Sequence, residues 1–177
     1  YFRDVDVVVL GIRHHDEYRL DLQAAGIAHR AVPALRAEGA ARTAQWAREQ
    51  LAECVGYWVH VDVDVLDPAV MPAVDAPDPG GIAYAELELL LSGLVSTPEC
   101  LGMELTVFDP DYDPDGSYAA EVVAAVVAGL APVSAAKPAL AAVDPPRYGA
   151  RIPRNRTKQT ANPDIPAGCD NSGISLV

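Results

Sequence analysis

Residues 57–68 read YWVHVDVDVLDP, a valine-rich run in which carboxylates appear towards the end. Valine and aromatic residues in a short apolar run are typical of a buried β-strand. Side chains alternate between the two faces of a strand, so His60, Asp62 and Asp64 would share one face. The run therefore predicts a buried strand over 57–65 that ends in two neighbouring carboxylates.

The sequence around this strand alternates between strand-like and helix-like segments. Short apolar or β-branched runs predict further strands at 5–10, 27–32 and 101–108. Helical spacing and helix-forming residues predict helices at 16–25, 40–54, 84–95 and 118–131. Because parallel neighbours need crossover connections, this order predicts an α/β fold, with three α-β-α layers around a mainly parallel sheet. Such sheets bind ligands at the carboxyl ends of their strands.

Charge and proline content divide the chain into two parts. Residues 1–132 hold 22 Asp and Glu against 7 Arg, a charge of −15, whereas residues 133–177 hold 3 Asp against 6 Lys and Arg, a charge of +3, and the two add to the net −12. The second part is also rich in proline and has little hydrophobic periodicity. We expect one folded α/β domain over 1–132 and a basic, proline-rich, disordered tail over 133–177.

Composition excludes several classes of function. A net charge of −12 repels phosphate backbones, so no nucleic-acid partner is expected. Acidic residues or prolines interrupt every apolar stretch before the ~20 residues that a membrane helix needs, so no membrane partner is expected. Three cysteines without C-x-x-C spacing fit a reducing compartment, and the expected location is the cytoplasm.

The paired carboxylates at the strand end have two interpretations. Two ionised aspartates in an apolar sheet would cost several kcal/mol each unless a cation compensates them. Oxygen ligands of this kind suit manganese or magnesium better than zinc or copper. Spacing alone favours equally a strand that runs out into solvent, with Asp62 and Asp64 hydrated and Asp67-Pro68 as a turn.

The loop that follows favours the metal-binding interpretation. Residues 71–82 read MPAVDAPDPGGI, built almost wholly of turn formers. A D-x-D-x-x-D-P strand end followed by a P-x-P-G-G loop resembles the signature of the arginase family, which includes arginases, agmatinases and formimidoylglutamases. The resemblance covers residues 5–132, from a strand closing in Gly11-Ile12-Arg13 to a last strand ending in Asp109-Pro110, and it does not extend into the tail.

The resemblance implies a manganese-dependent hydrolase of C–N bonds in linear amidines or guanidines. Asp62 and Asp64 would be ligands to a pair of manganese ions, and Asp16 would help to hold the amino groups of a small-molecule substrate. His60 and Asp67 are candidates to support the ligands without touching the metal. No residue is identified as catalytic. Homo-oligomers are common in the family, but nothing in the sequence specifies one.

The sequence departs from the family pattern in two respects. The G-G-D-H and D-A-H-x-D segments, which carry the remaining ligands, do not occur, so only half of a metal site is expected. In the family the D-A-H-x-D strand lies between the strands that correspond to 5–10 and 57–65. Its loss would leave a gap unless those strands close up or another chain fills the slot. In addition, Val107 occupies the position of the glutamate with which arginases grip guanidinium, which argues against arginine as the substrate.

Two alternatives remain open at this point. The chain is either a working hydrolase or a catalytically inactive fragment, or degenerate member, that binds metal weakly or self-associates. A minor alternative is a haloacid dehalogenase-like phosphatase, whose nucleophile strand resembles Asp62-Val63-Asp64. That fold needs a later lysine, and residues 1–132 contain none.

Overall fold

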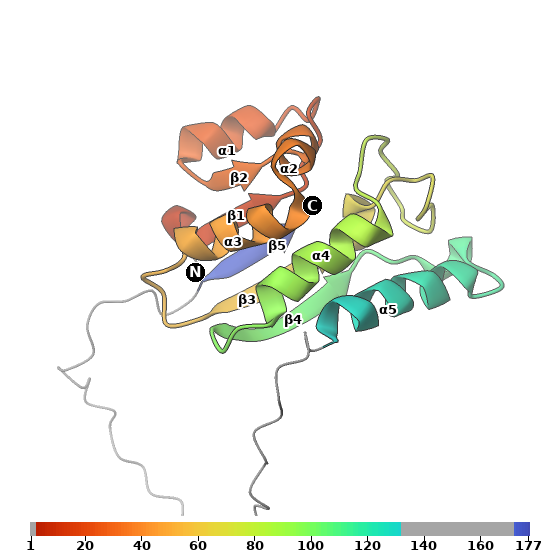
Figure 1. The fold of residues 1–177 in the computed structure, drawn as a ribbon. Helices are drawn as coiled ribbons and strands as arrows, with labels where there is room; N and C mark the ends of the chain where they lie inside the picture. The colour runs from red at the N-terminus through yellow and green to blue at the C-terminus, as the bar shows by residue number, and fades with distance from the viewer. Residues whose placement is uncertain (1–2, 132–171) are drawn as a thin grey trace, which may run out of the picture.

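A computed structural model of the protein describes residues 3–131 and 172–177. These residues form a five-stranded sheet in the order β2-β1-β5-β3-β4, in which all neighbouring strands are parallel (Figure 1). The strands are β1 Val7–Leu10, β2 Ala28–Arg30, β3 Tyr57–Asp62, β4 Cys100–Thr106 and β5 Gly173–Leu176. The predicted α/β class with a parallel sheet is confirmed.

The helices lie close to their predicted positions, with one addition. They are α1 Arg19–Ala25, α2 Val32–Glu38, α3 Ala40–Gln50, α4 Tyr84–Val95 and α5 Ser117–Leu130. Three short 3-10 turns are η1 Asp4–Asp6, η2 Val63–Val65 and η3 Pro110–Tyr112. Helix α2 was not predicted. In the described part of the chain, no helix has the length and apolar character needed to span a membrane.

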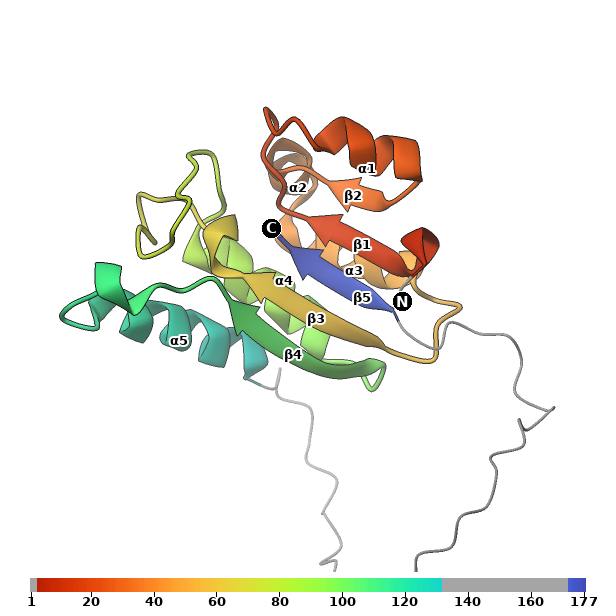
Figure 2. The ribbon, with the colours of Figure 1, turned by 180° about the vertical axis from the view of Figure 1, so that it is seen from behind.

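Helices cover the two faces of the sheet unequally. Helices α3 and α4 lie over one face, with α5 packed alongside α4, whereas α1 lies on the opposite side next to β2 (Figures 1 and 2). On the covered face, Val59 and Val61 of β3 are fully buried, as are four leucines of α4. On the other face, Trp58 is 42% exposed. The main core therefore lies between the sheet and the α3–α4 layer.

Strand β5 corrects the prediction made for the tail. We expected residues 133–177 to be disordered, and for residues 172–177 this is wrong, while residues 132–171 lie outside the described part of the chain. Strand β5 pairs with β1 on one side and with β3 on the other. Its side chains Ile174 and Leu176 are 1% and 0% exposed. The slot expected between the two strands is therefore filled by the chain's own residues, because backbone pairing and apolar burial offset the cost of ordering them.

Candidate functional site

The end of β3 forms a turn that gathers two carboxylates. The strand was predicted to run to Val65, but it ends at Asp62, and the 3-10 turn η2 follows. The Asp62 carboxylate accepts a hydrogen bond from the Asp64 backbone N–H at 3.1 Å, which stabilises this turn. The two carboxylates are thus neighbours because of a turn, not because they alternate along one strand.

A cavity of about 360 Å³ lies at the carboxyl ends of β1, β5 and β3. It brings together Asp16, Asp62 and Asp64, the three residues predicted as metal or substrate ligands. Its full lining is Val9, Ile12, Arg13, Asp16, Tyr18, Leu22, Asp62, Asp64, Asp78 and Val177. This is the edge of a parallel sheet at which ligands are expected to bind.

At this edge of the sheet, the charged form of the Asp64 carboxylate is disfavoured. Burial and then the neighbouring charge of Asp62 raise the pKa of Asp64 to about 6, and the positive charge of Arg13 only partly opposes the rise. The Asp16 carboxylate is half-buried and accepts a hydrogen bond from the Tyr18 backbone N–H at 2.7 Å. The cavity therefore has an excess of negative charge that a bound cation would relieve.

The glycine-rich loop, residues 77–81, is held to the end of β3 through the side chain of Asp67. This carboxylate accepts hydrogen bonds from the backbone N–H groups of Ala69 at 2.9 Å and Gly80 at 2.8 Å, which lower its pKa. Gly80 has φ +98°, a conformation that favours glycine. A Cβ on Gly81 would lie 2.5 Å from the Asp67 backbone nitrogen, so the close approach of the loop requires glycine there as well.

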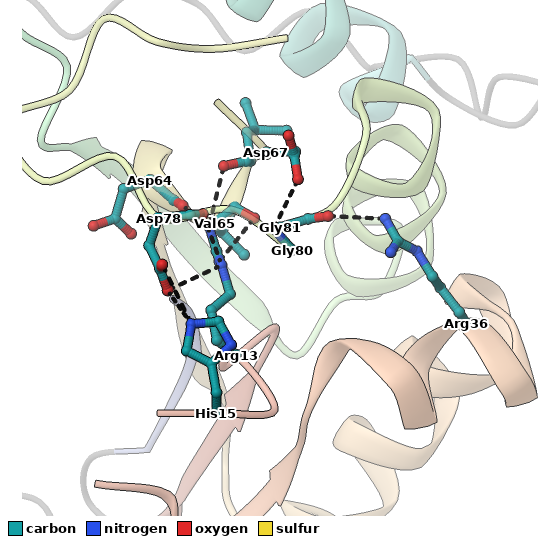
Figure 3. Close-up of polar contacts among 10 residues, drawn as sticks. Arg13, His15, Arg36, Asp64, Val65, Asp67, Asp78, Gly80 and Gly81 are labelled. Carbon is teal, nitrogen blue, oxygen red and sulfur yellow. Dashed lines mark hydrogen bonds and ion pairs between the residues drawn. The ribbon is translucent and has the colours of Figure 1, made fainter. Parts of the chain in front are cut away.

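Arg13 and His15 hold the other side of this loop (Figure 3). The Arg13 guanidinium donates to the Asp64 carbonyl at 2.6 Å and to the Asp78 carbonyl at 2.9 Å. The His15 Nε2 lies 3.0 Å from the Asp78 carboxylate. Neither Arg13 nor Asp78 was singled out as a site residue from the sequence. Arg13 lies in the Gly11-Ile12-Arg13 motif and Asp78 in the P-D-P-G-G loop, so the motifs were visible although the contacts between them were not.

His60 and Asp67 are not among the residues that line the cavity. His60 Nδ1 lies 2.9 Å from Glu104 Oε1, and its Nε2 lies 3.4 Å from Thr106 Oγ1. His60 lines a separate, largely apolar cavity of about 230 Å³ together with Trp58 on the open face of the sheet. Supporting roles for His60 and Asp67 stay predictions.

Val107 lies outside the cavity as well. It lines a different hollow together with Asp75 and Asp109. Its φ of +70° is uncommon for a β-branched residue. The structure therefore places no side chain from this position against Asp62 and Asp64.

The donor set fits a divalent cation only in part. Asp62 and Asp64 offer carboxylate oxygens, the ligand type that hard cations such as Mn²⁺ and Mg²⁺ prefer. Within residues 3–131 and 172–177, however, no group of three or more His, Cys, Asp or Glu side chains is placed to hold a metal ion. The described residues accordingly offer two carboxylates for a cation and do not by themselves form a larger ligand group.

Similar proteins fall into one family of hydrolases. An N(1)-aminopropylagmatine ureohydrolase of Thermus thermophilus is 34% identical over 79 residues, covering 44% of this chain and 26% of that protein. A formimidoylglutamase of Chromobacterium violaceum is 38% identical over 81 residues, covering 44% of this chain and 26% of the relative. The chain thus matches about a quarter of the length of these curated relatives.

Solved structures agree with the sequence matches. The native structure of an arginase from Bacillus caldovelox superposes with a TM-score of 0.62 and 26% identity, covering 70% of this chain and 42% of the arginase. The profile of the Arginase family matches residues 1–131. These matches do not support the phosphatase alternative. Since the profile match includes all of the predicted ligands and most of the chain, the chain belongs to the Arginase family.

Proposed function

We propose that the cavity is part of the active site of a ureohydrolase, an enzyme that hydrolyses C–N bonds in linear amidines or guanidines. The observation that carries the proposal is that Asp16, Asp62 and Asp64 line one cavity at the strand ends of an Arginase-family fold. In this proposal, Asp62 and Asp64 bind manganese and Asp16 binds an amino group of the substrate. Two catalytic manganese ions are the family's usual complement.

The chemistry of the proposed site follows from its charges. A divalent metal, when bound, lowers the pKa of water enough to provide a nucleophile near neutral pH. The carboxylates of Asp62 and Asp64 would hold the cation, whose positive charge would favour the ionised form of Asp64 against the burial and the neighbouring Asp62 charge that raise its pKa. Asp16 attracts a cationic group and orients the substrate. Val107 in place of a gripping glutamate argues for amidines or guanidines other than arginine.

We further propose that residues other than the described ones, or a second polypeptide, supply the remaining metal ligands. The support is the two-carboxylate donor set in the described residues and the limited length over which the chain matches its relatives. By this proposal the chain alone binds cation weakly and turns over substrate poorly. Full activity requires the completed site.

Manganese binding tests the proposal directly. We would measure bound Mn²⁺ by isothermal titration and by elemental analysis after desalting, for the wild type and for Asp62→Ala and Asp64→Ala. Each substitution removes one of two ligands, so affinity should fall about tenfold or more. Asp111→Ala is the matched control, because Asp111 is an exposed aspartate that does not line the cavity.

The outcomes separate the alternatives. Weak Mn²⁺ binding that both cavity variants lose and the control retains supports the proposal, and a screen of amidines for ammonia, urea or formamide release should then follow. Two tightly bound ions per chain with turnover would show that this chain completes the site by itself. Equal binding in all four proteins would rule out Asp62 and Asp64 as ligands, and no binding by the wild type would overturn the proposal that this chain binds a cation and favour an inactive fragment.

A further inference from the structure

Arg13 is a buried cation at the point where β1 ends. Its side chain is 6% exposed, and it follows Gly11, whose φ of +90° turns the chain at the strand end. A Cβ on Gly11 would lie 2.5 Å from a methyl carbon of Val65, so this turn packs directly against η2. The guanidinium is thereby held beside the turn that carries Asp64.

The hydrogen bonds of Arg13 join two segments that are far apart in the sequence. On η2 and just beyond it, the guanidinium donates to the carbonyls of Asp64 at 2.6 Å, Val65 at 3.2 Å and Leu66 at 3.2 Å. On the glycine-rich loop, its Nε and Nη2 donate to the Asp78 carbonyl at 3.2 and 2.9 Å. Figure 3 shows the guanidinium between these two segments. One side chain thus fixes two walls of the cavity.

The hydrogen-bond acceptors of Arg13 are main-chain carbonyls, so no carboxylate is hydrogen-bonded to its guanidinium. The Asp78 carboxylate lies 4.0 Å from Nε, beyond hydrogen-bonding distance. A guanidinium directs its donors in a rigid, planar fork, which suits several carbonyls of one turn. The positive charge meanwhile opposes the rise in the pKa of Asp64.

We propose that Arg13 is the positioning residue of the cavity, which holds the Asp64 turn and the Asp78 loop in the geometry that binds a cation. This inference rests on the proposed function. Arg13 acts through the backbone of Asp64 and of Asp78 and does not contact the cation. The geometric role requires the fork of a guanidinium, so a lysine at this position should not replace it although the charge is kept.

Arg36 provides a matched control on the same loop. It donates to the Gly81 carbonyl at 2.8 Å and pairs with Glu86 at 3.0 Å, and it does not line the cavity. Figure 3 shows it approaching the loop end from the other side. Substitution of Arg36 removes a guanidinium–carbonyl bond from the same loop and leaves the Asp64 turn intact.

The test compares Arg13→Lys and Arg13→Gln with Arg36→Lys and Arg36→Gln in the full chain. Three quantities are measured: the melting temperature, Mn²⁺ affinity by titration, and amide hydrogen exchange of residues 63–67 and 78–82. We expect both Arg13 variants to lower Mn²⁺ affinity about tenfold and to speed exchange in both segments. The Arg36 variants should speed exchange only near residues 80–82 and keep the affinity within about twofold of the wild type.

The results also separate this inference from the proposed function. If affinity falls in proportion to melting temperature across Arg13 and Arg36 variants alike, Arg13 is merely structural and the inference is wrong. If the wild type binds no Mn²⁺, the proposed function fails, but exchange still tests positioning: unchanged exchange at 63–67 in Arg13→Lys would overturn it. If Arg13→Gln does not fold, Arg13→Lys alone gives the comparison with Arg36→Lys.

Discussion

In the candidate site, the surroundings of Asp64 disfavour the ionised form of its carboxylate. Its carboxylate is half-buried beside Asp62, and its pKa is raised to about 6 from an ordinary value of 3.8. The folded protein therefore binds this proton more tightly than the unfolded chain does. The resulting stabilisation is fully present below pH 3.8 and is lost as the pH rises through 6.

The metal-free protein should thus lose stability between pH 4 and pH 7, and Asp64→Asn should reduce that loss. A pKa difference of this size corresponds to about 3 kcal/mol for a fully buried group, and solvent screening at a half-exposed site reduces the expected loss to about 1 kcal/mol. Urea unfolding at several pH values measures it. Asp111→Asn is the control, and equal pH profiles for the two variants would contradict the assignment.

The sequence indicated some of the residues that line the cavity, but it did not indicate the contacts between segments that are far apart in the chain. Asp62 and Asp64 were predicted from a local motif and Asp16 from the family resemblance near Gly11-Ile12-Arg13; all three line one cavity, and their roles as ligands stay predictions. The role of Arg13 was not predicted, because its carbonyl partners lie 51 to 65 positions further along the chain. Backbone carbonyls carry no residue identity, so no pattern of side chains indicates them.

At the scale of elements, a single side chain sets the end of β3. The V-D-V-D-V run has a strand period, but the Asp62 carboxylate binds the Asp64 N–H and the strand stops there. Periodicity cannot detect such a stop, because alternation continues across it. Helix α2 was not predicted, although Pro33 near its start is a favoured first-turn residue.

Asp113 gives an element-scale prediction at the start of α5. It is 7% exposed, and its carboxylate accepts hydrogen bonds from the backbone N–H groups of Tyr118 at 3.1 Å and Ala119 at 2.8 Å. Asp113→Ala leaves these donors without that acceptor and should lower the free energy of unfolding by about 1–2 kcal/mol. Asp111→Ala, at an exposed position outside α5, should change it by less than about 0.5 kcal/mol.

Chemical denaturation of both variants measures this difference. Circular dichroism should show a loss of helix signal in Asp113→Ala before global unfolding, because α5 then frays from its first turn. Indistinguishable unfolding curves for the two variants would show that Asp113 does not cap α5.

For the whole molecule, the arrangement of the sheet depends on six residues at the far end of the sequence. The strands of the family-matched region form two pairs, β2-β1 and β3-β4, and β5 joins them. Charge and proline content misled the sequence interpretation here, because they describe the average of a long segment. The alternation of Ile174 and Leu176 with small residues is a strand signal, but four residues are too short for it to outweigh that average.

Substitutions on opposite faces of β5 test this joining role. Ile174 is 1% exposed towards the α3–α4 layer, whereas Ser175 is half-buried on the open face of the sheet. Ile174→Asp would bury an unpaired carboxylate and remove apolar contacts, so it should cost at least about 3 kcal/mol. Ser175→Asp places the same charge on the same strand facing outward, and should cost about 1 kcal/mol or less.

Urea unfolding and size-exclusion chromatography of both variants measure the effect. Ile174→Asp should unfold at lower urea and, with β5 displaced, expose the facing edges of β1 and β3, which favours association between copies. Ser175→Asp should elute and unfold much like the wild type. Equal behaviour of the two variants would mean that β5 does not join the two strand pairs in solution, and that some other segment must hold β1 beside β3 to form the cavity.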